Sequence, residues 1–306
     1  MANGKTYDLI IIGAGPAGMT AAIYARRAAK STLVLEASSY GGQIIKTPDI
    51  ENYPAEQNIS GTEFATRLYE QATSHGAEFV FEAATAIADE GGLKRVTTKK
   101  DEYTARAVII ATGSANRTLG VDGEEALVGR GISYCATCDG NFFRGRDVAV
   151  VGGGNTALED ALYMADIAKT VYLIHRRDSF RGDETTVRLL TERENVKIIY
   201  NSRVTKLEAE RRLTGIEVTD TSGEVTRLDI SGLFVAVGRI PVNGAFGNMI
   251  ELDSAGWAVS GEDCRTRTQG VFVAGDCRAK DVRQLVTAAA DGAVAANAAI
   301  KYISEK

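Results

Sequence analysis

Two segments of the chain share one pattern, and this repeat restricts the fold more than any other feature. In the first, the apolar run YDLIII precedes the glycine loop GAGPAG, and a helix-forming stretch and the run TLVLE follow. In the second, RDVAVV precedes GGGNTA, and a helix-forming stretch and TVYLIH follow. Gly13 and Glu36 are separated by 23 positions, as are Gly152 and His175. Each segment therefore predicts a strand–loop–helix–strand unit that binds a dinucleotide, and the equal spacing strengthens both predictions.

The segments after each repeat predict where the chain passes between domains. Short β-rich runs follow each unit and close on a strand with a glycine turn, ATG at 111–113 and AVGR at 236–239. The chain then returns through GVFVAGDCR and a helix-forming stretch, 284–303, that has no glycine fingerprint of its own. We therefore expect this returning segment to complete the first domain.

The predicted fold class is α/β, with two Rossmann-like, three-layer nucleotide-binding domains, the second inserted into the first. A chain of 306 residues with 44% hydrophobic residues is long enough for two such domains. The expected boundaries are residues 1–114 and 244–306 for the first domain, and 115–243 for the inserted second domain, which contains Cys135 and Cys138.

Charge and hydropathy exclude two classes of partner. The formal net charge is −5 and no long run of one sign occurs, so we expect no nucleic acid partner. The longest uncharged stretch, residues 9–25, is interrupted by the first glycine loop and is short for a membrane span, and Asp8 lies where a signal peptide would be apolar. We expect a cytoplasmic protein without a membrane partner.

The first glycine loop has the residues that a dinucleotide requires. Gly13 permits a tight turn, Gly15 lets the backbone approach a pyrophosphate, and Gly18 lets helix and strand pack closely. Glu36 ends the second strand, where a carboxylate can accept hydrogen bonds from ribose hydroxyls. An acid at this position suits an adenosine with a free 2′-hydroxyl.

The second loop predicts a different nucleotide. Gly152, Gly154 and Ala157 form the G-x-G-x-x-A variant. His175 takes the position of the acid, and Arg176, Arg177 and Arg181 follow it as a basic cluster. Because guanidinium groups bind a 2′-phosphate that a carboxylate would repel, the predicted second ligand is NADP(H).

The stretch CATCDG contains a pair of cysteines, Cys135 and Cys138, followed by Asp139. A four-thiolate metal site is not expected, because Cys264 and Cys277 are 13 positions apart and form no second C-x-x-C. A structural disulfide over so short a loop would restrain little of the unfolded chain. Redox chemistry is the best explanation, with Asp139 holding or donating a proton, and Cys277 is expected to be an inert buried thiol.

These motifs together make a family resemblance specific. The chain resembles the low-molecular-weight NADPH-dependent thioredoxin reductases through GAGPAG, GGQ at 41–43, ENYP at 51–54, ATG, CATCDG, GGGNTA, HRRDSFR and GVFVAGDCRAKDVRQLVTAAADG. The resemblance implies the cofactors FAD and NADPH, with electrons passing from NADPH through FAD and the cysteine pair to thioredoxin or a thioredoxin-like partner. It also implies a homodimer and a large swivel between the domains.

The resemblance further implies roles for individual residues. Cys135, Cys138 and Asp139 are the expected catalytic residues, with Cys138 nearer the flavin, while the thiol that first attacks the substrate stays open. No metal is expected. The expected FAD-binding residues are Gly13, Gly15, Pro16, Ala17, Gly18, Glu36, Gly42, Gln43, Asn52, Ala111, Thr112, Gly113, Gly275, Asp276, Arg283 and Gln284. The expected NADPH-binding residues are Gly152, Gly154, Asn155, Thr156, Ala157, His175, Arg176, Arg177 and Arg181.

Other functions use related chains. A ferredoxin–NADP reductase would have no use for CATC, and a ferredoxin-dependent thioredoxin reductase would have no use for HRR. Hydroperoxide-reductase flavoproteins carry an extra N-terminal redox domain, whereas here the first loop begins at residue 13. A small-molecule dithiol oxidase and a non-enzymatic nucleotide-sensing or flavin-storage module remain as alternatives.

Overall fold

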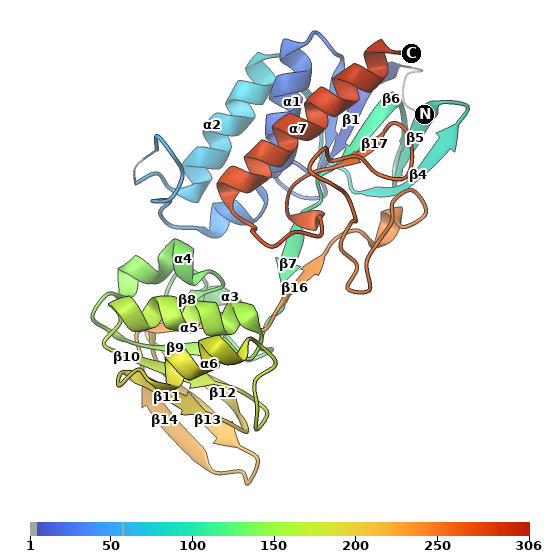
Figure 1. The fold of residues 1–306 in the computed structure, drawn as a ribbon. Coiled ribbons are helices and arrows are strands. Elements are labelled where there is room, and N and C mark those ends of the chain that lie inside the picture. Colours follow the sequence, from blue (N-terminus) through green and yellow to red (C-terminus); the bar gives the residue numbers. More distant parts are fainter. Residues whose placement is uncertain (1–4, 57) are drawn as a thin grey trace. The chain divides into compact units, whose positions relative to one another are not determined.

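A computed structural model describes residues 5–56 and 58–306, and the chain forms two compact units (Figure 1). The first unit contains Met1–Ala115 and Ile240–Lys306, and the second contains Asn116–Arg239. The chain passes between the units at β7 (Ser114–Asn116) and β16 (Arg239–Pro241), which pair as a two-stranded sheet.

The first unit is built on a largely parallel sheet with the order β3-β2-β1-β6-β5-β4, in which β17 also pairs with β6. The central strands are continuous apolar runs because both faces of the sheet are covered. Leu9 to Ile11 of β1 and Val108 to Ile110 of β6 have no exposed surface. The strands are β1 (Thr6–Ile12), β2 (Thr32–Leu35), β3 (Glu78–Val80), β4 (Ala84–Glu90), β5 (Leu93–Thr98), β6 (Glu102–Ile110) and β17 (Val271–Val273).

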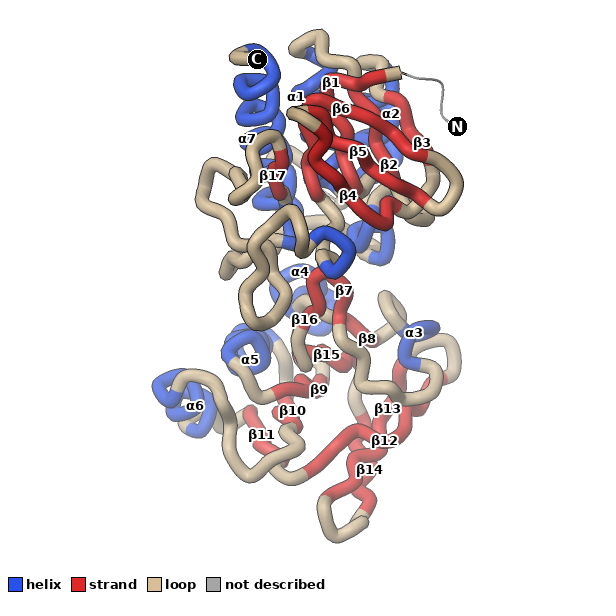
Figure 2. Tube along the Cα trace, turned by 90° about the vertical axis from the view of Figure 1, so that its right-hand side faces the viewer, coloured by secondary structure: helices blue, strands red, loops and turns tan. Residues whose placement is uncertain are grey.

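The helices α1 (Pro16–Arg27), α2 (Gly61–Ser74) and α7 (Leu285–Ser304) lie together on one side of this sheet, as Figures 1 and 2 show. Pro16 takes the first helical position of α1, where the missing N–H costs no hydrogen bond. The alanine-rich faces of α1 and α7 pack closely, and a Cβ at Gly292 would collide with the backbone carbonyl of Ala17. The C-terminal helix is therefore an integral part of the layer that begins at the first glycine loop.

The second unit has a parallel sheet with the order β11-β10-β9-β15-β8 and a separate antiparallel sheet, β12-β13-β14. One buried cluster, with Leu158 and Met164, lies between the parallel sheet and its helices. A second, with Ile216 and Leu233, lies between the two sheets. The strands are β8 (Ile132–Ser133), β9 (Asp147–Gly152), β10 (Thr170–Ile174), β11 (Val196–Ile199), β12 (Ser202–Ala209), β13 (Leu213–Asp220), β14 (Val225–Asp229) and β15 (Gly232–Ala236).

The helices of the second unit are α3 (Glu124–Leu127), α4 (Ala136–Asp139), α5 (Asn155–Ile167) and α6 (Glu184–Thr191).

Both units also contain short 3₁₀ segments. The first unit has η1 (Gly42–Lys46), η3 (Gly244–Phe246) and η4 (Gly275–Cys277), and the second has η2 (Gly140–Phe143). The predicted α/β class with parallel sheets is confirmed in both units.

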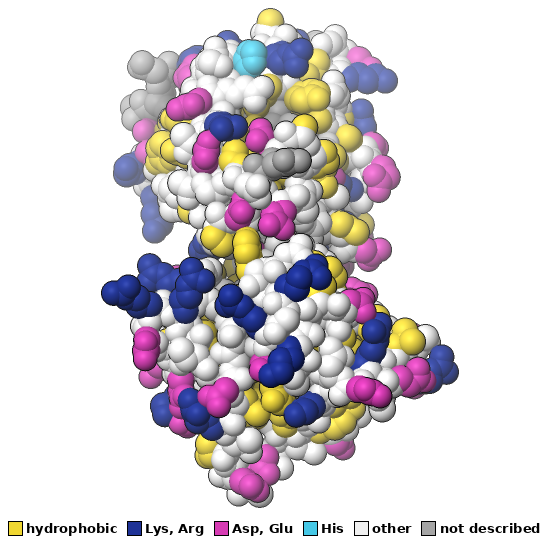
Figure 3. Space-filling view, turned by 90° about the vertical axis from the view of Figure 1, so that its left-hand side faces the viewer, with side chains coloured by type: hydrophobic (Ala, Val, Ile, Leu, Met, Phe, Trp, Pro, Cys, Tyr) yellow, Lys and Arg dark blue, Asp and Glu magenta, His cyan; other side chains and the backbone are white. Residues whose placement is uncertain are grey.

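The helices and one drawn face of the protein bear on what a membrane or nucleic acid partner would require. Across residues 5–56 and 58–306, no helix is both long and apolar enough to span a membrane. On the face drawn in Figure 3, side chains of both charge signs occur on both units.

Candidate active site

The first glycine loop follows β1 and shows why its glycines are needed. Gly13 has a φ of 109°, and a Cβ there would collide with the backbone carbonyl of Ala111. A Cβ at Gly18 would likewise collide with the carbonyl of Gly13. By contrast, open space surrounds the corresponding position at Gly15, which caps α1. The loop thus leaves room for a ligand to approach the backbone at the start of the helix, which fits a dinucleotide pyrophosphate.

Glu36 lies beside this loop and is fixed by two backbone donors. Its Oε2 accepts a hydrogen bond from Ala14 N at 2.8 Å, and its Oε1 accepts one from Ser38 N at 3.0 Å. Each carboxylate oxygen retains further acceptor capacity. The position fits the predicted acceptor for ribose hydroxyls.

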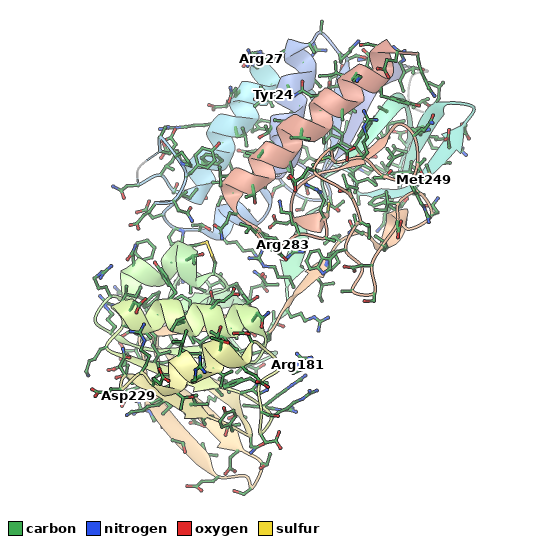
Figure 4. The ribbon with its side chains drawn as sticks, viewed as in Figure 1. Tyr24, Arg27, Arg181, Asp229, Met249 and Arg283 are labelled. Carbon is green, nitrogen blue, oxygen red and sulfur yellow. A yellow bond between two sulfur atoms is a disulfide. The ribbon has the colours of Figure 1, made fainter. Side chains whose placement is uncertain are left out.

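Two segments far apart in sequence meet near the start of α7. Asn52 Nδ2 donates to Gln284 Oε1 at 3.2 Å, and Gln284 caps α7 through a reciprocal capping box with Thr287. The guanidinium of Arg283 stacks over the ring of Trp257, 3.7 Å from its centroid, and Figure 4 shows where Arg283 lies. The sequence reading missed Trp257, although it is the single tryptophan of the chain.

A buried ionic group supports the returning segment and was also missed. Asp291 on α7 pairs with Arg278 at 2.8 Å and with Lys280 at 3.0 Å, and its Oδ2 accepts from Gly275 N at 2.9 Å. The group therefore holds the backbone next to Asp276, which lies in η4. The sequence feature that could have indicated this group is a single acid, Asp291, within the otherwise apolar helix sequence AAADGAVAA.

The remaining residues predicted to bind FAD lie at turns of the same unit. Gly42 and Gln43 begin η1, and Gly113 has a φ of 66° directly after β6. Thr112 Oγ1 donates to Asn243 Oδ1 at 3.3 Å, and Asn243 Nδ2 donates to the carbonyl of Cys277 at 2.8 Å. These bonds connect the end of β6 to the returning segment.

The second glycine loop follows β9 and is covered by the basic segment. A Cβ at Gly152 would collide with the Ala236 carbonyl, whereas the space at Gly154, which caps α5, is open. Arg181 N donates to the Gly153 carbonyl at 2.8 Å. Asp183 N donates to Asn155 Oδ1 at 2.9 Å. The backbone of the basic segment is therefore fastened to the loop itself.

The arginines of this segment are exposed, but its histidine is not. Arg176, Arg177 and Arg181 are exposed, and Figure 4 shows Arg181 pointing outward from its unit. His175 is 5% exposed and packs beneath the loop, where a Cβ at Gly153 would collide with its ring. Burial lowers the pKa of His175, which favours a neutral ring. This differs from the expected phosphate contact: His175 supports the loop from below, because β10 ends by turning its side chain into the core.

The cysteine pair lies at the start of α4 in the second unit. Cys135 and Cys138 are joined by a disulfide, and Cys135 is the residue that caps α4. The Thr137 hydroxyl lies 3.4 Å from Cys135 Sγ. A Cβ at Gly140 would collide with Tyr163 and Met164, so glycine lets this turn pack against α5. The disulfide is partly exposed on a short helix braced by a longer one.

Asp139 directly follows the pair and is held by the side chain of Ser133. Ser133 Oγ donates to Asp139 Oδ2 at 2.6 Å and also accepts from Cys135 N at 3.1 Å. Within the described chain, the buried Oδ1 of Asp139 has no hydrogen-bond partner. Burial raises the pKa of Asp139, and the Ser133 hydrogen bond opposes that rise only in part. Ser133, which the sequence reading missed, links the acid to the backbone of the first cysteine.

The two other cysteines are separate from this chemistry. Cys264 and Cys277 are buried and unpaired with each other, and burial raises the pKa of their thiols to about 12 and about 11. Cys277 is therefore the buried thiol that we expected. In the part of the chain that the structure describes, no cluster of three or more His, Cys, Asp or Glu side chains could hold a metal ion.

Residues 7–293, which contain both glycine loops and the disulfide, match the family model described as Pyridine nucleotide-disulphide oxidoreductase. The chain belongs to this family. A thioredoxin reductase of Listeria monocytogenes is 42% identical over 303 residues, which cover 98% of this chain and 95% of the relative. A bifunctional thioredoxin reductase/thioredoxin of Mycobacterium leprae is 41% identical over 308 residues, which cover 99% of this chain and 67% of that protein.

Solved structures agree with these sequence relationships. The crystal structure of thioredoxin reductase from Streptococcus pyogenes matches with a TM-score of 0.95 and 40% identity, covering 99% of this chain and 100% of that one. The predicted resemblance to thioredoxin reductases and the predicted fold with two nucleotide-binding domains are thereby confirmed.

Proposed function

We propose that this protein is an NADPH-dependent thioredoxin reductase. It transfers electrons from NADPH through FAD and the Cys135–Cys138 pair to oxidised thioredoxin or a thioredoxin-like protein. The observation that carries this function is the disulfide at the start of α4. The same chain has two dinucleotide loops, one followed by an acid suited to a free ribose 2′-hydroxyl and the other by arginines suited to a 2′-phosphate. The relatives named above support the same activity.

The cofactors are FAD and NADPH. When bound, FAD would supply the two-electron chemistry that couples oxidation of NADPH to reduction of the Cys135–Cys138 disulfide. In our proposal the first unit binds FAD through Gly13, Gly15, Gly18 and Glu36, together with the turns at η1, β6 and the returning segment. The open space at Gly15 and the anchored Glu36 carboxylate support this assignment.

The second unit binds NADPH in this proposal. Gly152, Gly154, Asn155, Thr156 and Ala157 cradle the pyrophosphate at the start of α5. The exposed side chains of Arg176, Arg177 and Arg181 bind the 2′-phosphate, while His175 shapes the loop from below. The basic segment is fastened to Gly153 and Asn155, which places its arginines next to the nucleotide loop.

The reduced pair acts by thiol–disulfide exchange. One thiolate attacks a sulfur of the thioredoxin disulfide, forming a mixed disulfide and releasing one thioredoxin thiolate, and the second thiolate then attacks the mixed bond. Thioredoxin gains two electrons and two protons, and Cys135–Cys138 returns to the disulfide. Asp139, whose pKa burial raises, donates or accepts the proton that moves as a thiolate leaves or forms.

The partner and setting are part of the proposal. Thioredoxin is the expected substrate, and the M. leprae relative is named for carrying both activities in one chain. The family resemblance favours a homodimer. The acidic net charge of −5 disfavours nucleic acid. Two free buried thiols suit the reducing cytoplasm.

Following NADPH oxidation with the purified holoenzyme and a panel of thioredoxins tests this function. We expect NADPH consumption that depends on added thioredoxin and is lost in Cys135→Ser. Consumption of oxygen in the presence of a small dithiol, with no turnover of NADPH, would instead identify a dithiol oxidase. Flavin binding without any turnover would support a storage or sensing module.

A further inference from the structure

Besides Asp139, a second buried acid lies next to α4, the helix that follows Cys135. Asp160 belongs to α5 and is 9% exposed. Its carboxylate accepts a hydrogen bond from the backbone N–H of Ala136, the first residue of α4. Ala136 itself has no exposed surface, because α4 packs against α5. The carboxylate therefore fixes the start of the helix that carries the cysteine pair.

The position of this contact matters because Ala136 directly follows Cys135. The carboxylate that accepts the Ala136 N–H therefore lies next to the first cysteine of the pair. An anionic carboxylate at this place repels a second negative charge nearby and so disfavours a thiolate on the pair. A neutral side chain in the same place would keep the hydrogen bond without the repulsion.

We propose that Asp160 is a positioning residue of the redox pair: its hydrogen bond to Ala136 fixes the start of α4, and its charge opposes thiolate formation at Cys135–Cys138. This inference rests on the proposed redox role of the pair. It assigns to α5, the helix that begins at the second glycine loop, a direct influence on thiol chemistry.

Burial brings the pKa of Asp160 into the physiological range. Burial raises the pKa of Asp160 to about 7; the Ala136 hydrogen bond opposes this rise, Glu159 on the same helix adds to it, and Arg239 opposes it. On the facing helix α4, Asp139 and the cysteines are the titratable groups. Asp160 is therefore largely neutral below pH 7 and anionic above it, so its opposition to the thiolate grows as pH rises.

Alkylation of the reduced pair as a function of pH tests the proposal directly. The purified flavoprotein is reduced with a phosphine and treated with iodoacetamide, and mass spectrometry of peptides measures modification of Cys135 and Cys138. Neither NADPH nor thioredoxin is present, so the result does not depend on the proposed catalytic function. Cys264 and Cys277 serve as internal references, because their raised pKa values keep them protonated.

Asp160→Asn retains an oxygen that can accept the Ala136 N–H but removes the charge. We expect up to roughly tenfold faster alkylation above pH 7, where Asp160 of the unaltered protein is anionic, so that the midpoint moves down by up to about one pH unit. Asp166→Asn is the matched control, since Asp166 is an exposed acid on the same helix, paired with Arg193. Its midpoint should equal that of the unaltered protein.

Asp160→Ala separates charge from structure. It removes both the charge and the hydrogen bond, so its midpoint should also fall while its melting temperature Tm falls further than that of Asp160→Asn. If both variants lose thermal stability but keep the original midpoint, Asp160 only supports the fold and the proposal is wrong. A shifted midpoint in an enzyme that fails to reduce thioredoxin would uphold this inference and overturn the proposed function.

Discussion

Replacing Asp291 should destabilise the first unit more than any exposed substitution nearby. Asp291 binds Arg278, Lys280 and Gly275 N within 3.0 Å, and the Arg278 side chain is only 5% exposed. Asp291→Ala leaves a buried guanidinium without its carboxylate. Removing one partner of a buried ion pair costs about 3–5 kcal/mol of unfolding free energy. For a unit of this size the loss corresponds to a fall in Tm of roughly 6–20 °C.

Thermal unfolding of the holoenzyme, followed by flavin fluorescence, measures this effect. Asp281→Ala is the matched control because Asp281 is exposed in the same segment. Asp291→Asn keeps an acceptor for Gly275 N but not the charge, so it should lose most of the same stability. FAD should dissociate more readily from both Asp291 variants, since Gly275 precedes the proposed flavin ligand Asp276. A Tm loss in Asp291→Ala no larger than that in Asp281→Ala would refute the reasoning.

Three further predictions concern the proposed ligands and the redox pair. Neutralising Arg176 and Arg177 together should weaken the binding of NADPH roughly ten- to a hundredfold and that of NADH far less, because charge-assisted contacts to the 2′-phosphate are lost. Binding titrations with both nucleotides measure this, and equal losses of affinity for both would show that the arginines have only a structural role. Replacing Cys135 or Cys138 by Ser should lower the anaerobic electron capacity from four to two per subunit, and a capacity of four in both variants would mean that electrons leave elsewhere. Asp139→Asn should reduce thioredoxin turnover about ten- to a thousandfold and flatten the fall of the rate as pH rises through the raised pKa of Asp139, which a pH–rate profile tests.

The sequence predicted the features that depend on local pattern. Apolar runs of strand length and glycine loops at equal spacing identified both parallel sheets, because buried strands and tight turns impose strong demands on nearby residues. The closing helix was also predicted, and the structure has it as α7 (Leu285–Ser304). The disulfide of Cys135 and Cys138 followed from their spacing and lies where the motif suggested.

Contacts between distant segments could not be predicted in this way. Asp160 and Ala136 meet only because α5 packs on α4, and Asp291 reaches Gly275 only because α7 returns to the sheet. His175 shows that a motif position does not fix the direction of a side chain. Its position in the repeat indicated a phosphate contact, but the direction of its side chain depends on where β10 ends and on the packing of Phe180.

The insertion of one unit into the other has a consequence for how the protein is made. The second unit, Asn116–Arg239, is continuous and can fold on the ribosome as soon as it has been synthesised. The first unit cannot, because β17 and α7 follow the whole second unit in the chain. Until then, the face of α1 that receives Gly292 stays uncovered. We therefore expect the nascent chain to fold its second unit, with the cysteine pair, first, and to gain its flavin only after α7 has emerged.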